Sequence, residues 1–344
     1  MKKSNFKPAE VRSGEKDWGY INIIDTLAVK FDMPVMVING ISDGPTFTVT
    51  AGLYPLEFCG VEAASRLYQQ LDPDEISGKL VIIPVVNMPI LQFRTPMFAL
   101  TKSLSPMDGK DITKVFPGDP EGTVTDVLAY KLFNDVILGS NYHVDLRGGD
   151  IDESHLQHTI FLQNGTPIDE TLKTMAQVFG LKYCLPSRPD ISHTMPGTLV
   201  YETIIRGIPS IISESGLGFN TQPSDDEVNG HVIGVMNLMK HYNMIEGKLV
   251  KPDKQYYLEP DRVRILASLP GIFKHIYDQA EEIRKGEVIG TICDLDGEVL
   301  SAVTAPCDAI IHEMMPRRLV YTGDRIYSLA VVAQETEYSL DSIH

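Results

Sequence analysis

The stretch PTFTVTAGLYPLEFCGVEAASRLYQQL, residues 45–71, predicts a strand, a loop and a helix in succession. Residues 45–53 form a short run rich in β-branched side chains and bounded by turn residues, which is typical of a buried strand. After residue 60 apolar side chains recur at positions 61, 64, 67, 68 and 71, close to the helical period. The segment therefore predicts one strand–helix unit of an α/β protein.

The same alternation continues on both sides of this segment. Further buried strands are expected at 78–87 (GKLVIIPVVN) and 208–216 (IPSIISESG), and further helices at 123–137 and 227–242. Repeated strand–helix units predict an α/β fold with a mixed, mostly parallel sheet flanked by helices. In such a sheet, functional residues gather at the carboxyl ends of the strands.

The pattern changes after the polar segment 248–255. From about residue 258 to 334, short runs are separated by Gly and Asp, which predicts a small all-β domain. We therefore expect an α/β domain over residues 1–250 and an accessory β domain over residues 258–334.

The β domain resembles the barrel-sandwich hybrid of biotinyl and lipoyl domains through the stretches KGEVIG, APCDAII and TGDRIYSLA. Those carrier domains present a modifiable Lys in a tight turn. The corresponding region here, residues 312–318 (HEMMPRR), contains no Lys. We therefore expect the domain to have a structural role or to form a homo-oligomer.

Charge and composition narrow the classes of partner. The 344 residues contain 30 Lys and Arg against 46 Asp and Glu, a formal charge of −16, which repels nucleic acid and anionic lipid. No apolar run is long enough to span a bilayer, and none follows the basic N-terminus as in a signal peptide. The four cysteines lie far apart, which favours reduced thiols. We expect a cytoplasmic protein without nucleic-acid or membrane partners.

Four loops at the predicted strand ends carry polar and glycine residues in a distinctive order. They read GLYPLE at 52–57, DGKDITKVFPGDP at 108–120, DLRGGD at 145–150 and SESG at 213–216. In order and spacing these loops resemble the succinylglutamate desuccinylase/aspartoacylase family of the zinc-carboxypeptidase superfamily. The resemblance implies a carboxypeptidase-like α/β fold and a deacylase-like activity in amino-acid metabolism.

The metal ligands of that family are changed in this chain. The resemblance implies a catalytic zinc held by two histidines and one glutamate, and the matching positions here are Tyr54, Arg147 and Glu57. A guanidinium has no lone pair for a metal and brings a positive charge of its own. We therefore expect no metal at this position and no other cofactor.

The first hypothesis is metal-independent cleavage of a C–N bond, an amide or a related bond, by hydrolysis or by lysis. Arg147, anchored by Glu57, would stabilise the developing oxyanion, and Glu214, which matches the general base of the family, would transfer the proton. Tyr54 is a further candidate proton donor. The catalytic residues are therefore expected to be Glu214, Arg147, Tyr54 and Glu57.

The expected substrate is a small, anionic, N-substituted amino acid. The Asn–Arg pair that holds a substrate carboxylate in the family is replaced by Thr113 and Lys114, so the charge is kept but the bidentate guanidinium is lost. The candidate substrate-binding residues are Lys114, Thr113, Asp111, Asp145, Lys102 and Arg94.

Two alternatives remain open. In the first, the protein is a zinc-dependent N-acyl-amino-acid deacylase whose ligands have moved to Glu57, His155 and His158, the two histidines having the i, i+3 spacing of one helix face. In the second, the protein is a non-catalytic member of the family that binds a metabolite. The other histidines have no ligand spacing and stay unassigned.

Overall fold

The fold is described from a computed structural model, which covers residues 3–4, 6–25, 27, 30–93, 104–150, 153–216, 222–316 and 318–337. Two candidate substrate-binding residues, Arg94 and Lys102, lie outside the described residues. Within the described part, no helix is both long and apolar enough to cross a membrane. All four cysteines are free thiols, as expected.

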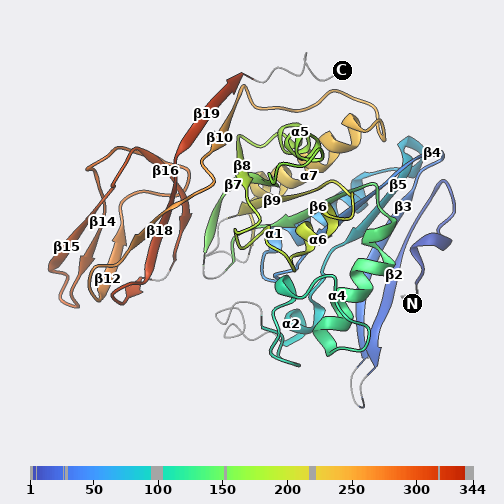
Figure 1. Ribbon diagram of the computed structural model, residues 1–344, viewed down its shortest axis with the longest axis horizontal. Helices are drawn as coiled ribbons and strands as arrows, with labels where there is room; N and C mark the ends of the chain where they lie inside the picture. Colours follow the sequence, from blue (N-terminus) through green and yellow to red (C-terminus); the bar gives the residue numbers. More distant parts are fainter. Residues whose placement is uncertain are drawn as a thin grey trace.

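Four neighbouring parallel strands form the centre of the main sheet, in the order β5-β4-β6-β9. Their bounds are Ser42–Ala51 for β4, Ser77–Ile83 for β5, Tyr142–Arg147 for β6 and Ser210–Gly216 for β9. The strands expected at 45–53, 78–87 and 208–216 are confirmed. Because the four strands are parallel, their carboxyl ends meet at one edge of the sheet (Figure 1).

Antiparallel strands extend this centre on both sides, so the sheet is mixed. On one side β3 (Lys30–Asn39) pairs with β5, and β2 (Glu15–Asp25) pairs with β3. On the other side β7 (Ser154–Leu162) is antiparallel to β9 and parallel to β8 (Tyr183–Ser187).

Alternation along β5 explains why helices cover both faces of the sheet. Leu80 and Ile82 belong to the core beneath α1 (Phe58–Gln70), α5 (Asp169–Phe179) and α7 (Asp225–His241). Val81 and Ile83 belong to the opposite core, beneath α4 (Val124–Asp135). Successive strand residues point to opposite faces, so a continuous apolar run supplies both layers.

The helices expected at 60–71, 123–137 and 227–242 are present as α1, α4 and α7. The last two begin with capping boxes, Thr123 with Asp126 for α4 and Ser224 with Glu227 for α7. Gly60 lets α1 approach β6 closely, because a Cβ at that position would lie 2.5 Å from the Leu146 carbonyl oxygen. The remaining helices and first strand are β1 (Lys3–Ser4), η1 (Pro8–Glu10), η2 (Pro73–Glu75), α2 (Met88–Phe93), η3 (Ile112–Lys114), η4 (Ile137–Gly139) and α6 (Leu199–Ile204).

The C-terminal region contains the separate small antiparallel sheet that the sequence predicts, in the order β15-β14-β12-β17. It stands at one end of the molecule, in orange and red in Figure 1. Its core includes Phe273, Ile292 and Tyr327. The C-terminal strands are β10 (Lys254–Leu258), β11 (Val263–Leu266), β12 (Gly271–His275), β13 (Glu282–Ile283), β14 (Val288–Cys293), β15 (Val299–Thr304), β16 (Ala309–Met314), β17 (Leu319–Val320), β18 (Arg325–Ala330) and β19 (Val332–Glu337).

The main sheet also runs into this region. β16 pairs with β7, β18 pairs with β16, and β11 pairs with β18, so the α/β sheet and the C-terminal strands share one hydrogen-bonded ladder. The turn expected at residues 312–318 is corrected in part, because His312–Met314 are the last residues of β16. All three residues are buried, and Glu313 and Met314 pair with the start of β7.

Candidate active site

A cavity of about 510 Å³ opens at the carboxyl ends of β6 and β9. Its wall comes from the loop after β4, from the strand ends of the main sheet and from the C-terminal strands β16 and β18. It brings together seven of the residues singled out in the sequence: Tyr54, Glu57, Asp111, Lys114, Arg147, His155 and Glu214. These candidate residues therefore lie together at the strand ends, where the sequence predicts them.

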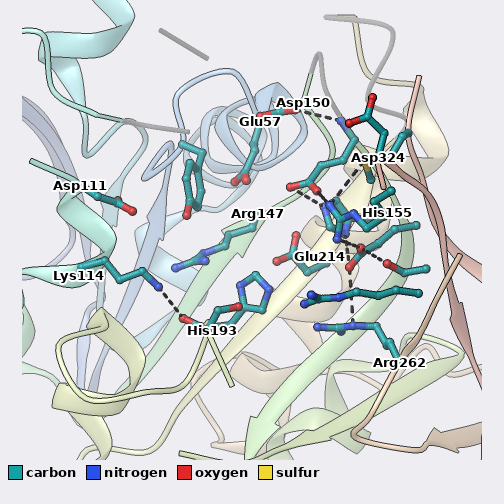
Figure 2. Close-up of a pocket in the computed structure, with 18 of the residues that line it drawn as sticks. Glu57, Asp111, Lys114, Arg147, Asp150, His155, His193, Glu214, Arg262 and Asp324 are labelled. Atoms are coloured by element: carbon teal, nitrogen blue, oxygen red, sulfur yellow. Dashed lines mark hydrogen bonds and ion pairs between the residues drawn. The ribbon is translucent and has the colours of Figure 1, made fainter. Parts of the chain in front are cut away.

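The centre of the cavity is a cation beside a carboxylate on neighbouring strands. Arg147 and Glu214 are register partners in the parallel pair β6–β9, and both side chains line the cavity. Figure 2 shows the two side chains extending next to each other, with Lys114 on one side and His155 and Arg262 on the other. Both residues are almost fully buried, so their charges act in a medium of low polarity.

Asp145 and Tyr54 hold the Arg147 side chain in place. Its Nε donates to Asp145 Oδ2 at 2.6 Å, and its guanidinium carbon lies 5.5 Å from the centre of the Tyr54 ring. Burial disfavours the charged guanidinium, but Asp145, Tyr54 and Glu57 more than offset this effect and raise the pKa of Arg147. The site therefore contains a permanent positive charge.

The two carboxyl groups of the site are shifted toward their protonated forms. Burial raises the pKa of Glu214 to about 7, while His155 and Arg147 pull it in the other direction. Burial and the neighbouring Glu214 raise the pKa of Glu57 well above its ordinary value. One oxygen of each carboxyl, Oε2, is buried and has no hydrogen-bond partner among the described residues. Such a pair suits proton transfer near neutral pH.

Two predicted substrate-binding residues do not line the cavity, and their roles are corrected. Asp145 is fully buried, and its two carboxylate oxygens accept from Thr50 and Arg147. Thr113 is buried, donates to Asp111 Oδ1 at 2.8 Å and accepts from the Tyr54 hydroxyl at 3.3 Å. Both residues support neighbours that do reach the cavity.

The helical spacing expected for His155 and His158 is wrong, because both lie in strand β7, with a register shift between them. His155 lines the cavity, with Nε2 3.7 Å from Glu153 and Nδ1 3.9 Å from Glu313. His158 Nδ1 donates to the Leu156 carbonyl at 2.7 Å. Among the described residues, no group of three or more His, Cys, Asp or Glu is placed to hold a metal ion.

The sequence reasoning missed the wall that the C-terminal strands supply. Arg262, Glu313 and Arg325 line the cavity, as do Glu153 and His193 from the α/β part. A signal was present for Glu313, because it is a charged residue inside the strand AIIHEM, which is apolar apart from His312, and so requires a buried partner. Nothing in the sequence showed that this strand pairs with β7.

A model of the succinylglutamate desuccinylase/aspartoacylase catalytic domain matches residues 43–203, the segment from β4 to α6. A crystal structure of a succinylglutamate desuccinylase/aspartoacylase from Rhodobacter sphaeroides is similar over the whole fold, with a TM-score of 0.80 at 24% identity. That similarity covers 94% of this chain and 98% of the other. The resemblance to the succinylglutamate desuccinylase/aspartoacylase family is therefore supported over residues 43–203, and the overall fold is similar to that of a solved protein of this name.

Other relatives extend the similarity across nearly the full length. An N-alpha-acetyl-L-2,4-diaminobutyric acid deacetylase from Halomonas elongata is 25% identical over 343 residues, 96% of this chain and 91% of the relative. A product-bound structure of the ectoine utilization protein EutE (DoeB) from Ruegeria pomeroyi matches with a TM-score of 0.81 at 18% identity. It covers 94% of this chain and 98% of the other. Members of the family are deacylase and desuccinylase hydrolases of N-acylated amino acids.

The zinc ion that the family resemblance implies does not fit the residues at positions 54, 57 and 147. Arg147 places a permanent cation where a second cation would have to sit. Burial raises the pKa of Tyr54, so its phenol keeps its proton, which it donates to Thr113. Glu57 is then the single conventional ligand of the three, whereas zinc sites use at least three.

Proposed function

We propose that the protein hydrolyses the amide bond of a small N-acylated amino acid, with Arg147 in place of a catalytic metal ion. The observation that carries the proposal is the register pair of Arg147 and Glu214 facing one buried cavity. It supplies the two elements that amide hydrolysis needs, a fixed positive charge and a carboxylate that exchanges protons near neutral pH. Hydrolysis is favoured over lysis because the named activities of the family are hydrolytic.

Glu214 acts as the general base in the proposed reaction. Its carboxylate takes a proton from a water molecule, and the water oxygen attacks the carbonyl carbon of the amide. The carbonyl π-electrons move to oxygen and form a tetrahedral oxyanion. The protonated Glu214 then gives its proton to the amide nitrogen, the C–N bond breaks, and a carboxylic acid and an amine are released. The proton that Glu214 takes from water is the proton that it gives to the amide nitrogen, so the scheme needs no other proton donor or acceptor.

Arg147 stabilises the oxyanion in this scheme. Its Nε donates to Asp145, and its side chain lines the cavity, where the terminal amino groups of the guanidinium would donate to the oxyanion. Loss of one donor that faces a developing oxyanion commonly costs about 100- to 1000-fold in kcat. A buried guanidinium held in one orientation needs no reorganisation when the charge develops.

Glu57 and Tyr54 shape the same site from the loop after β4. Burial raises the pKa of each, which favours their protonated forms. In its protonated form Glu57 does not compete with the substrate for Arg147. Tyr54 supports the guanidinium with its ring, and its hydroxyl hydrogen is directed to Thr113.

The cations of the cavity suit a substrate with a free carboxylate. Lys114 and Arg262 line opposite sides of the cavity around Arg147 and Glu214 (Figure 2). Lys114 Nζ donates only to a backbone carbonyl, that of Ser192 at 3.3 Å, and to the sulfur of Met195, among the described residues. The named substrate of the Halomonas relative, an N-acetylated amino acid, has both the amide and the carboxylate that this arrangement would bind.

The test is turnover of a panel of N-acetyl and N-succinyl amino acids that includes N-α-acetyl-2,4-diaminobutyrate. Glu214→Gln and Arg147→Gln are each expected to lower kcat/KM by about 1000-fold on the best substrate. Glu202→Gln is the control, because Glu202 is a partly buried carboxylate of α6 outside the cavity, paired with Arg206 at 2.7 Å. Full turnover by Glu214→Gln or Arg147→Gln, or no turnover of any panel member, would contradict the proposal.

A second candidate function is zinc-dependent deacylation, favoured by the full-length similarity to a deacetylase. Elemental analysis of protein purified without chelator separates the two. The metal-independent reaction predicts less than stoichiometric zinc and no loss of turnover on adding a chelator. Stoichiometric zinc together with loss of activity on chelation would support the second candidate and overturn the first.

A further inference from the structure

We propose that Thr50 and His143 are positioning residues for Arg147, acting through Asp145. The inference rests on the proposed function, in which Arg147 is the cation of the site. Neither Thr50 nor His143 lines the cavity, and both are fully buried in the centre of the sheet. Their side chains form part of a continuous row of hydrogen bonds that ends at the guanidinium.

The row crosses three parallel strands. Ser210 Oγ in β9 lies 2.6 Å from His143 Nδ1 in β6, and His143 Nε2 lies 3.0 Å from Thr50 Oγ1 in β4. Thr50 Oγ1 donates to Asp145 Oδ1 at 2.7 Å, and Arg147 Nε donates to Asp145 Oδ2 at 2.6 Å. Strand register explains the row, because Thr50 pairs with Asp145, and His143 pairs with Ser210.

The donor and acceptor of every hydrogen bond in the row follow from the Asp145 carboxylate, which accepts at the end of the row. Thr50 has one hydroxyl hydrogen and gives it to Asp145, so it accepts from His143 Nε2–H. Burial lowers the pKa of His143 to about 4, so the ring is neutral and its Nδ1 accepts from the Ser210 hydroxyl. Each group in the row therefore has one arrangement that satisfies its neighbours.

A second histidine fixes the main chain of the same residue. His231 Nε2 lies 2.8 Å from the Arg147 carbonyl oxygen, which can only accept, so Nε2 carries the hydrogen. His231 Nδ1 then accepts from Ser213 Oγ at 3.0 Å. Arg147 is thus held through its carbonyl and through its Nε, while its side chain lines the cavity.

Such support matters because the cation has to be in place before the reaction begins. A guanidinium on a long side chain has many rotamers, and an oxyanion is stabilised best by donors that do not move. If Thr50 loses its hydroxyl, Asp145 Oδ1 loses the donor that Thr50 supplies, and the buried carboxylate can turn toward Arg147. Such a turn alters where the guanidinium points.

The kinetic test compares Thr50→Val with Thr50→Ser and Thr48→Val. Thr48 is the matched control: it lies two residues earlier on the same face of β4, is fully buried, and its hydroxyl bonds to Ser140 Oγ at 2.5 Å, away from Asp145. Thr50→Val is expected to lower kcat by about 10- to 100-fold with little change in KM. Thr50→Ser is expected to restore kcat to within about threefold, and Thr48→Val to leave it unchanged.

Nuclear magnetic resonance of protein with ¹⁵N-labelled His and Arg tests the row without a substrate. His143 is expected as the neutral Nε2–H tautomer, and exchange of the Arg147 Nε–H with solvent is expected to speed up about tenfold in Thr50→Val, the equivalent of one hydrogen bond. Thr48→Val should leave both signals unchanged. An Nδ1–H tautomer in the unaltered protein, or equal effects of Thr50→Val and Thr48→Val, would overturn the inference.

The two proposals fail in different ways. Full activity of Arg147→Gln contradicts the proposed function and removes the inference with it. Loss of activity in Arg147→Gln together with full activity of Thr50→Val contradicts the inference alone.

Discussion

Glu214 is the residue whose surroundings decide the chemistry of the site. Burial favours its protonated form, while His155 and Arg147 favour the carboxylate, and the balance leaves its pKa at about 7. His155 itself stays positively charged: burial opposes its charge, but Glu153, Glu214 and Glu313 raise its pKa to about 9. A base with a pKa near the working pH both accepts and returns a proton efficiently.

The first prediction is therefore the direction of the pH dependence. Glu214 has to be ionised to accept a proton from water, and it loses its charge as the pH falls below about 7. We expect kcat/KM to rise about tenfold per pH unit below pH 7 and to level off above it. The measurement is kcat/KM between pH 5 and 9 on the best substrate.

The control for this profile is Glu214→Gln measured over the same range. The residual kcat/KM of Glu214→Gln should not change with pH near pH 7, because the carboxyl group that titrates there has been removed. A limb that persists in Glu214→Gln would assign the titration to another group of the cavity, and Glu57 would be the first to examine.

Several residues of the candidate site could be predicted from the sequence. What the sequence did not show is how deep a residue lies along its strand. Arg147, Glu57 and Glu214 are recognisable because each stands at or near a strand end. Asp145 has the same appearance in the sequence, two positions before Arg147 and on the same face of β6. Because it lies one step deeper, Arg147 covers it, and its carboxylate contacts the guanidinium instead of a ligand.

At the scale of elements, local patterns were reliable and pairings between distant segments were not. The strand–helix unit at 45–71 has signals for both elements and for the turn between them. The spacing of His155 and His158 fits a helix face as well as it fits a strand with an irregularity, and the structure has the latter. The pairing of β7 with β16 joins residues about 160 positions apart, beyond the reach of any local pattern.

The second prediction concerns Arg262, just before β11, which the C-terminal strands bring to the cavity. Its side chain is 15% exposed, and among the described residues it forms an ion pair with Glu313 Oε1, which lies 3.8 Å from Nε, too far for a hydrogen bond. We therefore expect its guanidinium to bind a carboxylate of the substrate. Arg262→Gln is expected to raise KM by about tenfold while kcat stays within about threefold.

The matched control for Arg262 is Arg284→Gln. Arg284 belongs to the same C-terminal region, but its side chain is 69% exposed and lies outside the cavity wall. The kcat and KM of Arg284→Gln should equal those of the unaltered protein. Equal KM values for Arg262→Gln and the unaltered protein would remove Arg262 from the substrate-binding residues.

At the scale of the whole molecule, charge is distributed unevenly. The chain has a formal charge of −16, yet the wall of the described cavity combines arginine, lysine and protonated histidine side chains with carboxyl groups. The net charge predicts that polyanionic partners are repelled, and it carries no information about a small anion that enters the cavity. The predicted homo-oligomer and the domain limits at residues 250 and 258 stay predictions.

The last prediction concerns the ion pairs that hold the α/β part and the C-terminal strands together. Arg325 of β18 donates to Glu153 Oε2 at 2.6 Å, on the α/β side, and to Glu313 Oε2 at 2.8 Å in β16. Glu313 is 4% exposed, so without Arg325 it is a buried carboxylate with fewer partners. Removing one member of such a buried pair costs about 3 kcal/mol of unfolding free energy.

Urea unfolding of Arg325→Met and Lys254→Met measures this cost against a matched pair. Lys254 of β10 and Glu335 of β19 also join distant segments, with a 2.5 Å contact, but their side chains are 54% and 47% exposed. Water screens that pair, so Lys254→Met is expected to change the unfolding free energy by less than about 1 kcal/mol. Arg325→Met should lower the urea midpoint clearly more, because the loss falls on a buried carboxylate between two parts of one sheet. Equal midpoints for the two variants would mean that the shared ladder of β7 and β16, and not the arginine, joins these parts.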